Sequence, residues 1–106
     1  MANAWLRLWH DMPNDPKWRT IARVSGQPIA TVMAVYIHLL VSASRNVTTC
    51  HGGSLRGHIY FTKEDLARSL DVTEDGIGSI LYEMQGRGLD GDLISGWEKR
   101  QGKKEE

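Results

Sequence analysis

The pattern of apolar and polar positions predicts mostly helices in the first half of the chain, with one short strand before them. Residues 5–9 alternate tryptophan and arginine with leucine, which predicts a short strand with one face packed by tryptophans. Asp15 followed by Pro16 is typical of a helix N-cap and first position, and Gly26 predicts the end of that helix.

A second helix is predicted from about Pro28 to about Ser44, and we expect it to be the most buried helix. Its predicted apolar stripe comprises Ile29, Val32, Met33, Tyr36, Ile37, Leu40 and Ala43, widened by Val35, Leu39 and Val41. Residues 46–57 are rich in threonine, glycine and serine, which predicts a loop, and residues 58–61 then predict a short strand.

The second half of the chain predicts two short helices followed by a hairpin. Thr62, with Asp65 three residues later, predicts a capping box at the start of one helix. A tight turn at 71–72 leads to Thr73, which caps the next helix. The inner face of that helix is predicted to be Ile77, Ile80, Leu81 and Met84, with Gly86 and Gly88 ending it. Asp90-Gly91 between apolar residues predicts a hairpin turn, and Trp97 is expected to close its second strand onto the core.

This order of elements predicts an α+β fold of the winged helix-turn-helix type, mostly helical with a small antiparallel sheet as the wing. We expect residues 1–97 to form the domain and the charged tail 98–106 to begin a linker to a further C-terminal domain.

Composition narrows the function classes. Lysine and arginine together number 13, as do aspartate and glutamate, so the balance counts against a purely electrostatic nucleic-acid binder. A single cysteine, Cys50, excludes an internal disulfide, and the N-terminus has no signal-peptide pattern. The apolar stretch 29–43 is too short and too polar to span a bilayer. We therefore expect a cytoplasmic protein with no membrane partner.

Six short motifs carry a resemblance that covers roughly residues 4–101. They are AWLRLW at the start, DPKW at 15–18, HLLVSAS at 38–44, GHIYFTKEDLA at 57–67, GRGL at 86–89 and ISGWEKRQ at 94–101. In this order and spacing they resemble the N-terminal domain of phage replication proteins of the replisome-organiser and DnaD-like group. The loop 47–56 is longer and more polar than is typical of that group.

The resemblance implies a module of a phage or prophage replication protein that acts in the cytoplasm of a bacterial host. Its partners would be origin DNA, duplex or single-stranded, and replisome or primosome proteins such as the host helicase or a helicase loader. It also implies a longer protein, with a further domain after this one.

Charge restricts where DNA would be contacted. The segment 62–86 holds two basic and six acidic residues, a net charge of −4, which repels phosphates. The outward face of its second helix offers Ser79, Tyr82 and Gln85 for base edges. Phosphate contacts are expected from the basic residues Lys63, Arg87, Lys99 and Arg100.

Two other binding functions stay open. In one, the module acts through self-association, with Trp5 and Trp9 on an edge strand pairing with a second copy. In the other, the chain is a winged-helix transcriptional regulator, because a fold does not fix a function. Further coding sequence after Glu106 would favour a replication protein over a regulator.

Catalytic and metal chemistry is not expected. Cys50, His51 and His58, with His38, lack the paired spacing of zinc ligands, so no metal or other cofactor is predicted. Cys50 and His51 are neighbours in sequence, which does not bring a nucleophile and base together. The glycines of residues 86–91 follow no phosphate-loop pattern, and we predict that the chain is not an enzyme.

Overall fold

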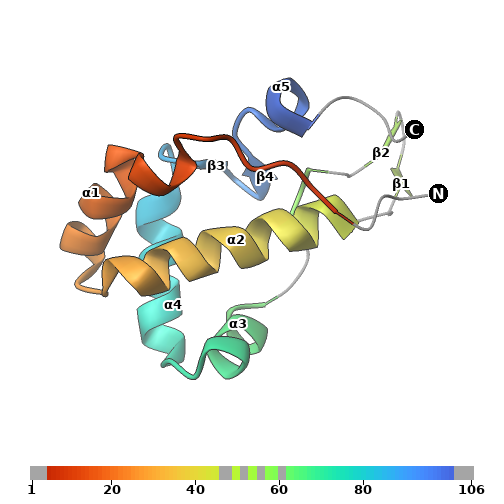
Figure 1. Cartoon of the computed structure of the whole chain (residues 1–106). Helices are drawn as coiled ribbons and strands as arrows, with labels where there is room; N and C mark the ends of the chain where they lie inside the picture. The colour runs from red at the N-terminus through yellow and green to blue at the C-terminus, as the bar shows by residue number, and fades with distance from the viewer. Residues whose placement is uncertain (1–4, 46–48, 51–52, 55–56, 60–61, 102–106) are drawn as a thin grey trace.

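The computed structural model describes residues 5–45, 49–50, 53–54, 57–59 and 62–101 (Figure 1). Its elements in chain order are a 3-10 turn (Met12–Asn14), α1 (Pro16–Ser25), α2 (Ile29–Arg45), β1 (Thr49–Cys50), β2 (Gly53–Ser54), α3 (Lys63–Leu70), α4 (Glu74–Met84), β3 (Leu89–Asp90), β4 (Leu93–Ile94) and α5 (Trp97–Gln101). The described chain is therefore α+β and mostly helical, with two antiparallel strand pairs, β1–β2 and β3–β4.

The helix boundaries follow the predicted capping chemistry. The Asp15 side chain accepts a hydrogen bond from the Lys17 backbone N–H at 3.0 Å, and Gly26 ends α1 in the left-handed region at φ 74°. Both hydrogen bonds of the Thr62–Asp65 capping box are present at the start of α3. Thr73 caps α4 by accepting from the Gly76 N–H at 3.0 Å. Each cap satisfies backbone donors that a helix leaves unpaired in its first turn.

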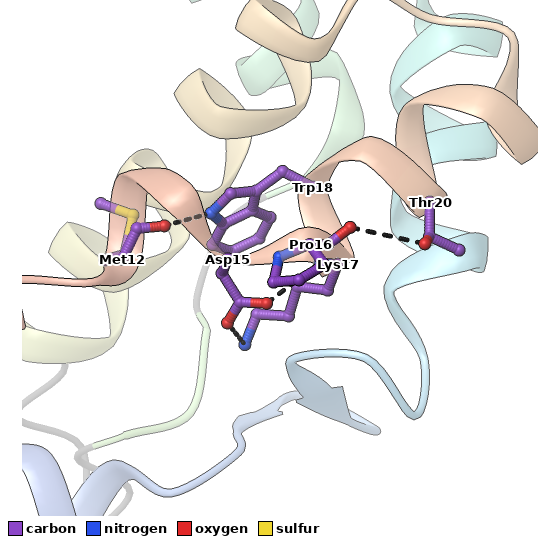
Figure 2. A network of polar contacts seen from close by, with 6 residues as sticks. All are labelled: Met12, Asp15, Pro16, Lys17, Trp18 and Thr20. Carbon is purple, nitrogen blue, oxygen red and sulfur yellow. Dashed lines mark hydrogen bonds and ion pairs between the residues drawn. The ribbon is translucent and has the colours of Figure 1, made fainter.

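Polar contacts at the start of α1 fix its orientation (Figure 2). The Trp18 indole N–H donates to the Met12 carbonyl oxygen, which joins the 3-10 turn to the helix. The Lys17 ammonium lies 3.5 Å from the Asp15 carboxylate and over the rings of Trp9, Trp18 and Tyr36, at 5.8, 5.1 and 5.6 Å from their centroids. A cation over aromatic faces is attracted to the negative electrostatic potential of the rings, so Lys17 closes one edge of the aromatic core.

The core forms around α2, which runs through the middle of the molecule with α3 on one side and α5 on the other (Figure 1). Helix α2 contacts α1, α3, α4 and β4. The side chains that fill this core come from all the main helices and the β3–β4 hairpin. The largest fully buried ones include Trp18, Tyr36, Ile21, Leu39, Leu40, Leu66, Ile77, Ile80, Met84, Leu89 and Ile94. Trp97 is also buried, as expected, but it opens α5 instead of extending β4.

The buried face of α2 differs from the predicted stripe. Ile29 and Ile37 are exposed, at 43% and 39%, whereas Val35 and Leu39 are fully buried. Because α2 is apolar almost all the way round, its periodicity does not distinguish the face that packs from the one that does not.

The predicted N-terminal strand is wrong, since residues 5–9 form no strand. The Gln101 side chain takes the place of a neighbouring strand. Its amide oxygen accepts from the Arg7 N–H at 2.9 Å, and its amide nitrogen donates to the Arg7 carbonyl at 2.7 Å.

The loop predicted over residues 46–57 contains the β1–β2 hairpin. Of the strand predicted over residues 58–61, His58 forms an isolated bridge with Leu93, Ile59 is in no strand, and residues 60–61 lie outside the described residues. The β3–β4 hairpin is present, but its two-residue loop is Gly91-Asp92 instead of Asp90-Gly91, because Asp90 pairs with Leu93. Gly91 there has φ 65°, a conformation that glycine adopts without strain.

No single described helix is long and apolar enough to cross a membrane. Only α1 and α2 taken together have that length and apolar character, and the two helices are bent by 112° where they meet.

Candidate nucleic-acid interface

Helix α4 presents a polar outer face, as the sequence predicted. Ile77, Ile80 and Met84 are fully buried, which turns Ser79 and Tyr82 outward. Tyr82 is 76% exposed, the most exposed large hydrophobic side chain among the described residues. A tyrosine held this way offers a ring for stacking and a hydroxyl for hydrogen bonding.

Lys63, at the start of α3, extends along this face. Its Nζ lies 3.9 Å from where a Cβ on Gly78 would be. Gly78 and Tyr82 are four residues apart in α4 and therefore on the same side of the helix. Lys63, Ser79 and Tyr82 thus form one surface, which we call the α4 patch.

Gln85 and Arg87 lie at the other end of α4, and both are held by the protein itself. The Gln85 side chain donates to the Gly91 carbonyl and accepts from the Gly91 N–H, each at 2.9 Å, so it fixes the hairpin to the helix. The Arg87 guanidinium donates to the Glu83 backbone carbonyl at 2.9 Å and to its carboxylate at 3.3 Å. DNA would have to displace these contacts before either side chain could bind it.

Lys99 is exposed on α5, and the side chain of Arg100 lies outside the described residues. Helices α3 and α5 lie on opposite sides of α2 in Figure 1. The predicted DNA-contacting residues are therefore not gathered into one surface: Lys63, Ser79 and Tyr82 meet, and Lys99 lies apart from them.

The surface built by α3, α4 and the β3–β4 hairpin is acidic. Residues 62–94 carry three basic and eight acidic side chains, a net charge of −5. Asp90 and Asp92, at the tip of the hairpin, are both exposed, and Asp92 lies 2.8 Å from the His58 ring nitrogen. Negative charge of this size repels phosphates and attracts cationic groups.

Positive charge lies on the N-terminal side of the molecule instead. Residues 5–45 carry five basic and two acidic side chains, a net charge of +3. Arg19 and Arg23 are both exposed on α1, one helical turn apart. Their i, i+4 spacing, which is visible in the sequence, places both on one side of α1. Neither was predicted to contact DNA.

The two tryptophans proposed for self-association are not equivalent. Trp9 is half-buried and meets the Tyr36 ring edge-on at 6.3 Å between centroids, so it belongs to the core. Trp5 is 63% exposed. Residues 5–9 do not form the edge strand through which both were expected to pair, and the Gln101 side chain hydrogen-bonds the Arg7 backbone there. Self-association itself stays a prediction.

Within the described ranges, no three histidine, cysteine, aspartate or glutamate side chains gather as metal ligands would. His51 and the side chain of Cys50 lie outside those ranges. A shallow, open crevice between Trp9, Tyr36, Trp97 and Gln101 has about 160 Å³ of empty space, solvent at its mouth included, which is below the usual size of a small-molecule pocket.

Alanine at Gly78 is expected to stabilise the domain while leaving the α4 patch in place. Glycine in a helix interior costs about 0.5–1 kcal/mol relative to alanine, and the new methyl would meet only Lys63, at 3.9 Å. Urea unfolding followed by far-UV circular dichroism measures the change. Gly76→Ala is the control, because its Cβ would lie 3.1 Å from Gln27 Oε1 and from Thr73 Oγ1. Equal stabilisation by both variants would contradict this account of α4.

Comparison of the chain with protein-family models, with curated proteins and with solved structures finds no match.

Proposed function

We propose that this chain is a winged-helix binding module of a phage-type replication protein, and that the α4 patch contacts DNA. The supporting observation is the arrangement around the hairpin. Helices α3 and α4 follow each other across the turn at Asp71, and the hairpin follows α4. The segment before α3 lies against that hairpin: Ile59 N–H donates to the Asp92 carbonyl at 2.7 Å, and Ile94 N–H donates to the Gly57 carbonyl at 2.8 Å. Such a third strand position beside the wing is typical of winged helices.

In this module α4 is the helix that would enter the major groove. Ser79 and Tyr82 face outward, where their hydroxyls can hydrogen-bond base edges, and Lys63 supplies a phosphate contact beside them. The acidic first turn of α4, with Glu74 and Asp75, limits affinity. We therefore expect weak, salt-sensitive binding, with further affinity contributed by other parts of the replication protein.

Fluorescence anisotropy with labelled duplex and single-stranded DNA at two salt concentrations tests the proposal. Lys63→Ala/Tyr82→Ala is expected to weaken binding on the order of tenfold and to lower the salt dependence by about one phosphate contact. Arg19→Ala is the control, because it removes an exposed arginine from α1, outside the α4 patch. It should change the affinity for DNA by less than about twofold. Binding lost through Arg19→Ala and kept in the double variant would place DNA on α1 and reject the α4 patch.

A basic protein partner is the second candidate, and the net charge of −5 over residues 62–94 favours it. A lysine- and arginine-rich labelled peptide should then bind, an acidic peptide of equal length should not, and Tyr82→Ala should weaken the complex. No DNA binding at low salt up to about 100 µM, together with peptide binding, would replace DNA by a replisome protein as the ligand of this face.

A further inference from the structure

The side of α2 that faces away from the core presents a row of apolar side chains. Helix α2 carries no lysine, arginine, aspartate or glutamate before Arg45, its last residue. Its outer face presents Ala30, Ala34, Ile37 and Val41, spaced by four, three and four residues. Ile37 and Val41 are each 39% exposed, Ala30 is exposed and Ala34 is partly exposed. This 4-3-4 spacing is that of the seam along which two helices pack in a coiled coil.

The outer face is also graded in size. Its N-terminal half is small, with two alanines, and its C-terminal half is bulky, with isoleucine and valine. When two identical helices pack antiparallel about a twofold axis, each residue faces one at the opposite end of its partner. Ile37 then faces Ala34 of the second copy, and Val41 faces Ala30. Large side chains meet small ones along the whole seam, whereas a parallel pair would set bulky against bulky and small against small.

Charge agrees with the same register. Continuing the antiparallel pairing places Arg45 opposite the α1–α2 turn of the second copy, at Gly26. The adjacent Gln27 lies against the first turn of α4, since its Oε1 is 3.1 Å from where a Cβ on Gly76 would be. That turn carries Glu74 and Asp75, both exposed. In this register Arg45 of each copy would lie near these two acids of the other.

We infer that a second copy of this chain docks antiparallel along α2, through Ala30, Ala34, Ile37 and Val41, with Arg45 paired to the acids at the start of α4. The 17 residues of α2 span about 25 Å. One helix of this length gives an interface at the small end of the range, so weak association is expected, with a dissociation constant on the order of micromolar or higher. The dimer leaves the α4 patch of each copy on the outside, and the inference does not depend on DNA binding.

Sedimentation equilibrium of the full chain from about 1 µM to about 1 mM, spanning the expected dissociation constant, tests the dimer. Val41→Glu should weaken association at least tenfold, because a carboxylate would be buried opposite an apolar surface. Val24→Glu is the matched control: the same change at a valine that is 50% exposed on α1 and is none of the four seam residues should weaken association far less than Val41→Glu. Circular dichroism verifies that both variants are folded.

A charge exchange tests the register. Arg45→Glu should weaken the dimer, and adding Glu74→Lys and Asp75→Lys should restore it. A monomer throughout the concentration range, or a dimer that Val41→Glu leaves intact, would overturn the inference. If Val41→Glu weakens the dimer but Glu74→Lys and Asp75→Lys fail to restore association of the Arg45→Glu variant, the antiparallel register would be overturned.

Discussion

Replacing Gly57 with alanine is expected to destabilise the domain by about 3 kcal/mol. Gly57 has φ 99°, which costs a residue with a side chain about 1–2 kcal/mol. Its Cβ would also lie 2.8 Å from two atoms of the Trp97 indole, where real contacts do not occur. The indole is buried and rigid, so relief of the clash requires movement of Trp97 or of the strand segment beside β4.

Gly57 joins three parts of the fold, which is why the local clash is expected to spread. Its N–H donates to the Ala43 carbonyl at the end of α2, and its own carbonyl accepts from the Ile94 N–H in β4. Movement of this backbone would therefore strain both hydrogen bonds, in addition to displacing Trp97. Part of the expected cost is overpacking, which is usually about 1–3 kcal/mol in a closed core.

Gly91→Ala separates the two causes. Gly91 has φ 65°, and nothing lies within 4 Å of its Cβ position, so only the conformational cost of about 1 kcal/mol applies. Thermal and urea unfolding measured by far-UV circular dichroism give both values. A loss of about 3 kcal/mol lowers the midpoint by roughly 12–24 °C in a domain of this size. If the two variants lost equal stability, contact with Trp97 would not be what requires glycine at position 57.

Local chemistry explains which elements the sequence predicted well. Helix starts and ends depend on residues next to each other, as in the capping box of Thr62 and Asp65 or the left-handed Gly26. The outward face of α4 was also predictable, because Ile77, Ile80 and Met84 leave only one way to turn the helix. The acidic character of the same surface follows from counting charges.

Contacts between distant residues explain what was missed. Gln101 hydrogen-bonds Arg7 across 94 positions, and no local pattern in residues 5–9 indicates that a side chain will replace a strand. Gln85 was expected to read bases because it follows an exposed helix face, yet its amide is held by Gly91. In α2 the choice between Ile37 and Leu39 as core residues depends on the elements packed against the helix, which the apolar pattern does not specify.

The i, i+4 spacing of Glu83 and Arg87 is visible in the sequence and by itself indicates an ion pair at the end of α4. Arg87 was expected to bind phosphate, although a carboxylate one turn earlier is a competing partner. The structure puts that carboxylate 3.3 Å from the guanidinium. An exposed arginine that already pairs with a nearby carboxylate of its own chain is therefore a weaker candidate for a phosphate contact.

Trp18→Ala is expected to have the largest effect on stability, a loss of about 3–5 kcal/mol. Trp18 is fully buried, its ring lies 4.5 Å from the Tyr36 ring centroid, and the Lys17 ammonium lies 5.1 Å above it. Truncation removes these contacts together and leaves a cavity that the surrounding helices fill only in part. Because a domain of this size is stabilised by about 5–15 kcal/mol, a substantial unfolded fraction is expected at moderate temperature.

Trp18→Phe separates packing from hydrogen bonding. Phenylalanine keeps a ring against Tyr36 but loses the N–H that donates to the Met12 carbonyl. That carbonyl also accepts from the Asp15 N–H at 3.2 Å, so it keeps a partner and the cost of the lost bond is expected to be about 1 kcal/mol. Urea unfolding followed at 222 nm, which does not depend on tryptophan emission, gives both free energies. If Trp18→Phe destabilised the domain as much as Trp18→Ala, the hydrogen bond to Met12 would dominate over aromatic packing, because only the alanine variant removes the ring that Tyr36 and Lys17 contact.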